Sequence, residues 1–230
     1  MRQPALRRHY GPFLLALVAL FLIAGFAPVR AEGLFHTREL FSTDLAAFTK
    51  WDRVVERAEQ EQHSTATCTA ATPGCAAAEW QALVAELRAL PLRARVERAN
   101  DVLNRRPYVT SQANWHDPDH WETPYEFLER GGQCEDYAIA KFMALAASGV
   151  PERDLRLVVV RDTAKLLDHA ILVVYVDGEP LVLDNQIKEV TPAARVTGYV
   201  PYYSINRTGW WYHQHDGATG ARLASASGLR

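Results

Sequence analysis

Cys134 lies where a cysteine can act as a nucleophile. It follows Gly131-Gly132-Gln133 and begins a helical pattern, Cys134 to Ser148, that has acidic residues in its first turn and ends before a Gly-Val-Pro stop. The backbone N–H groups and the dipole at a helix start stabilise a thiolate and can hold a developing oxyanion. The alternative is a small buried core cysteine, which the glycine-preceded helix start disfavours.

His169 and Asp184 are expected to share one face of a β-hairpin. Two apolar strand patterns are joined around Asp177-Gly178, a strong hairpin signal. In an antiparallel hairpin the numbers of paired residues have a constant sum, which is 355 for a two-residue loop and 357 for a four-residue loop. Either sum puts His169 and Asp184 on the same face. At 355, His169 faces Gln186 and Asp184 is its diagonal neighbour, about 7–8 Å away between Cα atoms; a three-residue loop would separate them.

A thiolate, an imidazole and a carboxylate in this arrangement form a nucleophile, a base and an orienting acid. Cys134 would attack a carbonyl, and His169 would take and return the proton. Asp184 would fix the imidazole tautomer and support the imidazolium. Taken singly, a histidine at a strand end is usually structural and an aspartate there usually belongs to a turn, so the hypothesis depends on their relative position.

Helical patterns precede strand patterns along the chain, an order that predicts an α+β fold with an antiparallel sheet. Apolar residues at three- and four-residue spacing mark the helices, and short β-rich runs mark the strands. The expected helices cover Leu40 to Gln62, with Ser42 or Thr43 as the cap, Ala76 to Asn104 with a break at Pro91, Thr123 to Gly132, and Cys134 to Ser148. The expected strands cover Leu155 to Arg161, Ala170 to Val176, and Leu181 to Asp184.

The first 31 residues have the three-part pattern of a secretory signal peptide. A basic start is followed by residues 13–26, which are apolar apart from one glycine, and small side chains precede a cut after Ala31. An uncleaved membrane anchor is the alternative, but this apolar run is short for spanning. We therefore expect an exported domain over 32–212. We expect residues 213–230 to be a disordered tail, in which His213 and His215 form no metal site.

The charge of the exported chain disfavours a nucleic-acid partner. The segment 1–31 holds four Arg and no acid, so without it Lys+Arg falls from 25 to 21 while Asp+Glu stays at 27, and the net charge changes from −2 to −6. A nucleic-acid binder needs a basic face to neutralise phosphates.

Export also affects the expected oxidation state of the three cysteines. In an oxidising compartment two are expected to pair, and Cys68 and Cys75 lie in one short turn-rich segment between helical patterns. We predict a disulfide between them, which leaves Cys134 unpaired. Two free thiols or a zinc site are the alternatives; export disfavours the first, and the second lacks nearby histidine or cysteine ligands.

The motif Gly132-Gln-Cys-Glu-Asp-Tyr-Ala-Ile-Ala-Lys141 resembles the bacterial transglutaminase-like cysteine proteinases, in particular their LapG-type members. The resemblance continues in further stretches, which occur in the family's order and cover the mature chain. They are Trp121-Glu-Thr-Pro124, Glu126-Phe-Leu128, His169-Ala-Ile-Leu172, Leu181-Val-Leu-Asp184-Asn185, Tyr203-Ser-Ile-Asn206 and Trp210. It implies a papain/transglutaminase-like fold with Cys134, His169 and Asp184 as the triad.

The resemblance also implies a place and partners. It implies a periplasmic, calcium-dependent endopeptidase that clips a large adhesin near its N-terminus after a di-alanine; we expect this enzyme to be a monomer. This cleavage releases the adhesin from the outer membrane and disperses biofilm. A LapD-type inner-membrane receptor that senses cyclic di-GMP would sequester the protease through its periplasmic domain.

The implied calcium ligands flank the nucleophile, and one departs from the family pattern. Glu135 matches, whereas Gln133 stands where the family usually has aspartate, and Asp136 is a third candidate ligand. Calcium accepts an amide oxygen, but losing a charge should weaken binding. Glu135 and Asp136 should raise the pKa of Cys134, an effect that a bound cation would reverse. The alternative is that both acids complement the helix start and point away from the sulfur.

Other functions would use the same residues. A transglutaminase, or an amidase acting on peptidoglycan peptides, shares the triad and the acyl-enzyme. A non-catalytic periplasmic binding module is a third class, which the intact triad order disfavours.

Overall fold

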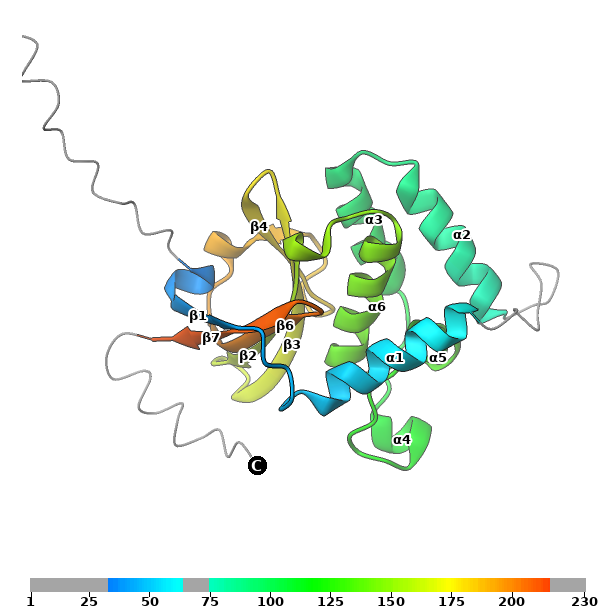
Figure 1. Ribbon diagram of the computed structural model, residues 1–230, viewed down its shortest axis with the longest axis horizontal. Helices are drawn as coiled ribbons and strands as arrows, with labels where there is room; N and C mark the ends of the chain where they lie inside the picture. Colours follow the sequence, from blue (N-terminus) through cyan, green and yellow to red (C-terminus); the bar gives the residue numbers. More distant parts are fainter. Residues whose placement is uncertain (1–32, 64–74, 216–230) are drawn as a thin grey trace, which may run out of the picture. The chain divides into compact units, whose positions relative to one another are not determined.

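The strands form a seven-stranded sheet in which all neighbours are antiparallel, in the order β1-β7-β6-β2-β3-β4-β5 (Figure 1). These coordinates come from a computed structural model, which describes residues 33–63 and 75–215. The strands are β1 (Arg38–Ser42), β2 (Leu155–Asp162), β3 (Leu167–Val176), β4 (Glu179–Leu183), β5 (Thr191–Pro192), β6 (Tyr199–Asn206) and β7 (Gly209–Gln214). The α+β expectation is confirmed.

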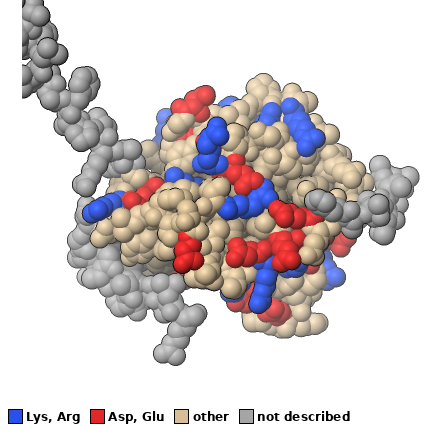
Figure 2. All heavy atoms as spheres, in the orientation of Figure 1, with Lys and Arg blue, Asp and Glu red and all other residues tan. Residues whose placement is uncertain are grey.

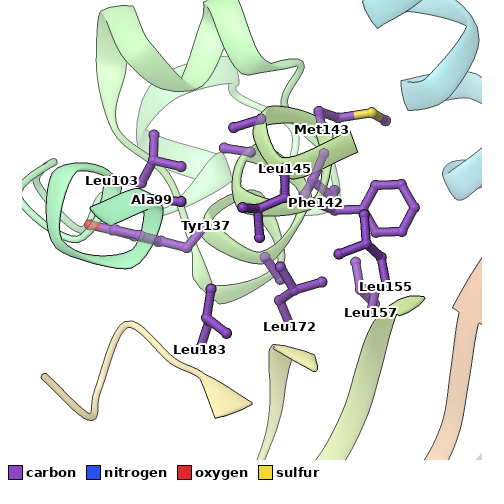
Figure 3. Close-up of a cluster of buried hydrophobic side chains, with 14 of the residues drawn as sticks. Ala99, Leu103, Tyr137, Phe142, Met143, Leu145, Leu155, Leu157, Leu172 and Leu183 are labelled. Carbon is purple, nitrogen blue, oxygen red and sulfur yellow. The ribbon is translucent and has the colours of Figure 1, made fainter. Parts of the chain in front are cut away.

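The α-helices gather on one side of the sheet, with α6 closest to it (Figure 1). They are α1 (Thr49–His63), α2 (Ala76–Arg88), α3 (Leu92–Leu103), α4 (Ser111–Trp115), α5 (Pro124–Arg130) and α6 (Cys134–Ala147). Short 3₁₀ turns cover Leu34–His36, Glu152–Asp154 and Ala193–Arg195. Every residue of α6 from Asp136 to Leu145 is buried, so this helix is the centre of the core. In Figure 3, Phe142 and Leu145 of α6 lie among side chains of α3, β2, β3 and β4.

The break at Pro91 and the start of α5 are confirmed. Pro91 is the N-cap of α3, and the Thr123 side chain accepts a hydrogen bond from the backbone of Glu126, whose side chain bonds back to Thr123. Gly131, with φ 72°, ends α5 in a conformation that favours glycine. No helix among the described residues is long and apolar enough to cross a bilayer.

The N-terminal helix was predicted to start too early. Leu40 and Phe41 belong to strand β1, where they pair with Tyr212 and Trp211 of β7, and α1 begins only at Thr49. The Phe41 and Trp211 rings lie 4.9 Å apart between centroids. The apolar residues that suggested a longer helix are therefore divided between a sheet edge and α1.

The expected start of the C-terminal tail is also wrong by a few residues. β7 runs to Gln214, and His213 is buried rather than part of a polar tail. Its Nδ1 lies 2.8 Å from the Thr37 hydroxyl and its Nε2 lies 3.0 Å from the Ser204 hydroxyl. His213 therefore joins the segment before β1 to β6. The predicted signal peptide, Cys68 and residues 216–230 lie outside the described residues.

The cysteine predictions are met as far as the described residues extend. Cys134 is free, and Cys75 is disulfide-bonded. The Cys75 sulfur also accepts a hydrogen bond from the Ala78 N–H, so it caps α2. Its pairing with Cys68 stays a prediction.

We predict that His213 makes stability depend on pH. Burial lowers the pKa of His213 to about 4, against the opposing attraction of Glu39. The unfolded chain binds a proton near pH 6.5 and the folded chain does not, so stability should fall as pH drops from 6.5 to 4. The expected loss is on the order of 2 kcal/mol. Urea unfolding across this range measures it.

His213→Gln keeps hydrogen-bonding groups but cannot titrate, so it should flatten this part of the pH profile. His116→Asn is the matched control, because His116 is exposed at φ 56°, which asparagine tolerates. An unchanged slope in His213→Gln would contradict the assignment.

Candidate active site

The turn before α6 holds Cys134 at the helix start. Asp136 accepts hydrogen bonds from the backbone N–H of Gln133 at 2.7 Å and of Glu122 at 2.8 Å. At Gly132, a Cβ atom would lie 2.6 Å from Asp136 Oδ2 and 2.8 Å from Glu122 Oε2, so only glycine fits there. The buried aspartate and this glycine therefore fix the turn that presents the sulfur.

The Cys134 thiol is partly exposed and protonated in this arrangement. Its S–H donates to Glu135 Oε2 at 3.2 Å, and the N–H of Ala170 lies beside the sulfur. Burial, followed by the charge of Glu135, raises the pKa of Cys134 to about 12, against the opposing Ala170 N–H. Of the two neighbouring acids, Glu135 therefore acts on the sulfur, which matches the expectation that an acid raises the pKa of Cys134. Asp136 instead caps the helix start, which matches the alternative expectation.

His169 and Asp184 form a buried hydrogen-bonded pair. His169 Nε2 lies 2.8 Å from Asp184 Oδ1, and both residues are almost fully buried. Asp184 also accepts from the Gln186 N–H at 2.8 Å and from the Tyr199 hydroxyl at 2.7 Å. Burial alone would raise the pKa of Asp184, but its hydrogen bond to His169, the attraction between the carboxylate and that ring, and the bonds from Gln186 and Tyr199 lower it below its usual value. The carboxylate is therefore ionised and fully hydrogen-bonded.

The hairpin register is the one that the two-residue loop predicts. Val176 pairs with Glu179 around Asp177-Gly178, both of which have positive φ, and all pair numbers add up to 355. Gln186 was expected opposite His169, and its Nε2 lies 3.1 Å from His169 Nδ1. The shared face of His169 and Asp184 is thus confirmed.

The structure brings the three candidate residues to one place. The Cys134 sulfur meets the backbone of Ala170, which adjoins His169 on β3. Among the described residues, no hydrogen bond joins the Cys134 sulfur to His169. The sulfur instead contacts Glu135, and His169 contacts Gln186. A cysteine at a helix start thus lies beside a hydrogen-bonded histidine–aspartate pair.

Sequence reasoning missed Tyr199, which donates to Asp184 and whose ring centroid lies 5.7 Å from that of His169. Tyr199 lies on β6, which pairs with β2 and not with β4, so no hairpin rule brings it to Asp184. Trp115 donates its indole N–H to Glu122 at 2.7 Å.

A buried cluster of acids lies behind the turn. Glu122 accepts from Asn114 and Trp115 through Oε1, while its buried Oε2 has no hydrogen-bond partner within the described part of the chain. Burial is the main cause that raises the pKa of Glu122. Burial, followed by the charge of Glu135, also raises the pKa of Asp136 to about 8. Carboxyl groups are therefore crowded near Cys134, and burial favours their neutral forms.

The predicted calcium ligands fit a hard cation only in part. Gln133 Oε1 accepts from the Ser111 N–H at 2.6 Å, and its Nε2 lies 3.5 Å from Glu135 Oε1. Both Asp136 oxygens are used by backbone N–H groups, so Asp136 is a capping residue here. Within the described ranges no three His, Cys, Asp or Glu side chains are grouped to hold a metal. The Glu135 carboxylate and the Gln133 amide oxygen nevertheless suit calcium chemically.

The sequence profile of the bacterial transglutaminase-like cysteine proteinases matches residues 55–218, a range that includes all three candidate residues. The chain belongs to this family. The family resemblance inferred from the Cys, His and Asp motifs is thereby confirmed. A comparison with curated proteins finds no match.

Solved structures of LapG from Legionella pneumophila share the fold. The calcium-bound form is 27% identical, covers 75% of this chain and 98% of that chain, and has a TM-score of 0.57. The EGTA-treated form is 28% identical over 71% of this chain and 88% of that chain, also with a TM-score of 0.57. The fold and the cysteine-proteinase family of this chain are therefore established.

Proposed function

We propose that this chain is a cysteine endopeptidase with Cys134 as nucleophile, His169 as general base and acid, and Asp184 as the orienting acid. The observation that carries the proposal is the buried 2.8 Å contact between His169 and Asp184 beside a cysteine at a helix start. Membership of a cysteine-proteinase family supports it.

The contacts of the imidazole assign its nitrogens. Nε2 faces Asp184, so Nε2 carries the proton and Nδ1 has the lone pair that can accept the thiol proton. Because the amide of Gln186 lies on Nδ1 and the thiol donates to Glu135, both contacts must be exchanged before transfer. Substrate binding would provide this exchange.

The reaction then follows acyl-transfer chemistry. Cys134 sulfur bonds to the peptide carbonyl carbon as its proton moves to His169 Nδ1, and N–H groups at the start of α6 stabilise the oxyanion. The adduct expels the amine, which takes the proton from His169 and leaves a thioester. A water molecule, deprotonated by His169, hydrolyses the thioester and releases the acid and the free thiol.

We further propose a periplasmic role like that of LapG-type proteases. The substrate would be a large surface adhesin cut near its N-terminus at a di-alanine site, with release of the adhesin and dispersal of biofilm. A LapD-type cyclic di-GMP receptor would control access. The similarity to Legionella LapG and the predicted signal peptide support this proposal. Where charge is visible in Figure 2, acidic and basic side chains are interspersed, which does not favour a nucleic-acid partner on that face.

Glu135 and Gln133 would hold a calcium ion, and the ion would supply positive charge beside the carboxylates that crowd Cys134. Burial, followed by the charge of Glu135, raises the pKa of Asp136, and a divalent cation there would oppose this shift. The relative described as calcium-bound supports the proposal.

Gln133→Asp is expected to tighten calcium binding by about tenfold, because it adds a formal charge to an oxygen ligand. Isothermal titration of the purified protein with calcium measures the change. Gln112→Asp adds the same charge on the exposed surface of α4 and should leave the affinity unchanged. Equal affinities in Gln133→Asp and the unaltered protein would rule Gln133 out as a ligand.

Cleavage of the N-terminal region of a candidate adhesin tests the proposed function. The purified protein is incubated with it in calcium and in EGTA, with Cys134→Ala as control. A cut at the di-alanine that needs both calcium and Cys134 is the expected result. Cleavage that EGTA does not affect would exclude a role for calcium, and amine incorporation without cleavage would favour a transglutaminase.

A further inference from the structure

Gln186 contacts both members of the His169–Asp184 pair. Its backbone N–H donates to Asp184 Oδ1 at 2.8 Å, and its side-chain Nε2 lies 3.1 Å from His169 Nδ1. His169 Nε2 meets the same Asp184 oxygen at 2.8 Å. Gln186 follows the end of β4 by three residues and is exposed, whereas His169 and Asp184 are buried. One surface residue therefore contacts the buried pair at both of its ends.

The far end of the Gln186 amide is held by Lys165. Lys165 lies in the turn that joins β2 to β3, and its ammonium donates to Gln186 Oε1. The buried Asp162 at the end of β2 fixes this turn, because its Oδ1 accepts from the backbone N–H groups of Ala164 and Lys165 at 2.9 Å each. Lys165 is thus anchored through its backbone, although its side chain is exposed.

The chemistry of lysine sets the orientation of the Gln186 amide. An ammonium group only donates, so the amide atom that faces it is the carbonyl oxygen, and the amide NH₂ group faces His169. The NH₂ group also only donates, so it bonds to the lone pair of Nδ1. This agrees with a proton on Nε2, which faces the Asp184 carboxylate. A single chain of donors thus runs from Lys165 through Gln186 and His169 to Asp184.

The lone pair on His169 Nδ1 is the one that must accept the thiol proton under the proposed function, on which this inference rests. We propose that Gln186 is a positioning residue that covers this lone pair in the free enzyme, and that Lys165 holds the Gln186 amide in place. The covered base cannot take the Cys134 proton, so the thiol of the free enzyme is kept unreactive. Because Gln186 and Lys165 are exposed, a bound peptide can displace the amide and uncover the base.

Gln186→Ala tests the proposal through the reactivity of Cys134, without a peptide substrate. The variant removes the amide and keeps the backbone N–H that bonds to Asp184. With iodoacetamide, the Cys134 sulfur bonds to the methylene carbon as iodide leaves, and the thiol proton passes to His169 Nδ1. The rate of alkylation at Cys134, followed by mass spectrometry at one pH and one calcium concentration, should rise about two- to tenfold, the effect of one lost hydrogen bond. An equal or lower rate would overturn the proposal.

Lys165→Met tests the hold on the amide. It should raise the alkylation rate by a smaller factor than Gln186→Ala, because the amide loses its support but is still present. Loss of a nearby positive charge would by itself disfavour the thiolate and lower the rate, so the sign of the change separates the hydrogen bond from the charge. Lys188→Met, which removes an exposed charge two residues after Gln186, is the matched control and should not raise the rate. A rate that does not rise in Lys165→Met would refute the role of Lys165.

A double-mutant cycle asks whether Gln186 acts through His169. In a His169→Asn background, Gln186→Ala should no longer change the alkylation rate, and an equal rise in both backgrounds would contradict the proposal.

The imidazole ¹⁵N resonances of Cys134→Ala protein give a second readout, which does not depend on the folding of His169→Asn. Gln186→Ala should move the His169 Nδ1 resonance to lower field, because the lone pair loses its donor, and an unmoved resonance would refute the contact. Neither readout needs peptide cleavage. Faster alkylation with a moved Nδ1 resonance would therefore support the role of Gln186 even if no adhesin is cut, whereas an active protease with neither change would refute that role alone.

Discussion

Cys134→Ala is expected to lower kcat/KM for peptide cleavage by a factor on the order of 10⁴ to 10⁶. The variant removes the atom that bonds to the carbonyl carbon, and Cys75 cannot replace it because its sulfur is in a disulfide. Cleavage of an adhesin fragment, followed by mass spectrometry of the products, measures the loss. The fold should survive, because Cys134 is partly exposed and its thiol contacts only groups beside it, the Glu135 carboxylate and the Ala170 N–H among them.

Ser111→Ala is the matched control for this result. Ser111 is a buried residue close to the same turn, and its hydroxyl donates to the His120 carbonyl and not to a candidate catalytic residue. It should affect stability and leave the chemical step intact. Residual cleavage by Cys134→Ala at the level of Ser111→Ala would exclude Cys134 as the nucleophile.

The His169–Asp184–Gln186 arrangement could be predicted because it depends on local geometry. A two-residue turn fixes the register of adjacent strands, and the alternation of a strand then assigns each side chain to a face. The start of α6 could be predicted for the same reason, because Gly131, Gly132 and Asp136, the third residue of the helix, determine the local conformation.

The parts that could not be predicted depend on contacts between distant segments. Leu40 and Phe41 have a helical spacing with the residues that follow, but their partners in β7 lie far along the chain. Tyr199 reaches Asp184 from a strand that does not pair with β4. Lys141 is polar in sequence, yet packing of α3 and β3 on both sides of α6 buries it. Tertiary packing overrides the local pattern at each of these places.

Asp184→Asn is expected to lower kcat/KM by a factor on the order of 10² to 10⁴ while the fold persists. The amide has nearly the shape of the carboxylate, but its one oxygen replaces either Oδ1, which His169 and the Gln186 N–H contact, or Oδ2, which accepts from Tyr199. It cannot offer two acceptor oxygens, and it carries no charge. It therefore loses both the fixed Nε2–H tautomer and the support for the imidazolium. Cleavage kinetics on the adhesin fragment, with a thermal melt, measure both effects.

Tyr199→Phe separates the charge of Asp184 from its hydrogen-bond network. This variant removes one of the three hydrogen bonds to the Asp184 side chain, from the Tyr199 hydroxyl at 2.7 Å, but leaves the carboxylate ionised and bonded to His169. Its kcat/KM should fall by less than about tenfold, the loss of one hydrogen bond to a charged group. If Tyr199→Phe cost as much as Asp184→Asn, the carboxylate would act mainly as a structural anchor for β6, and its role as the orienting acid would be refuted.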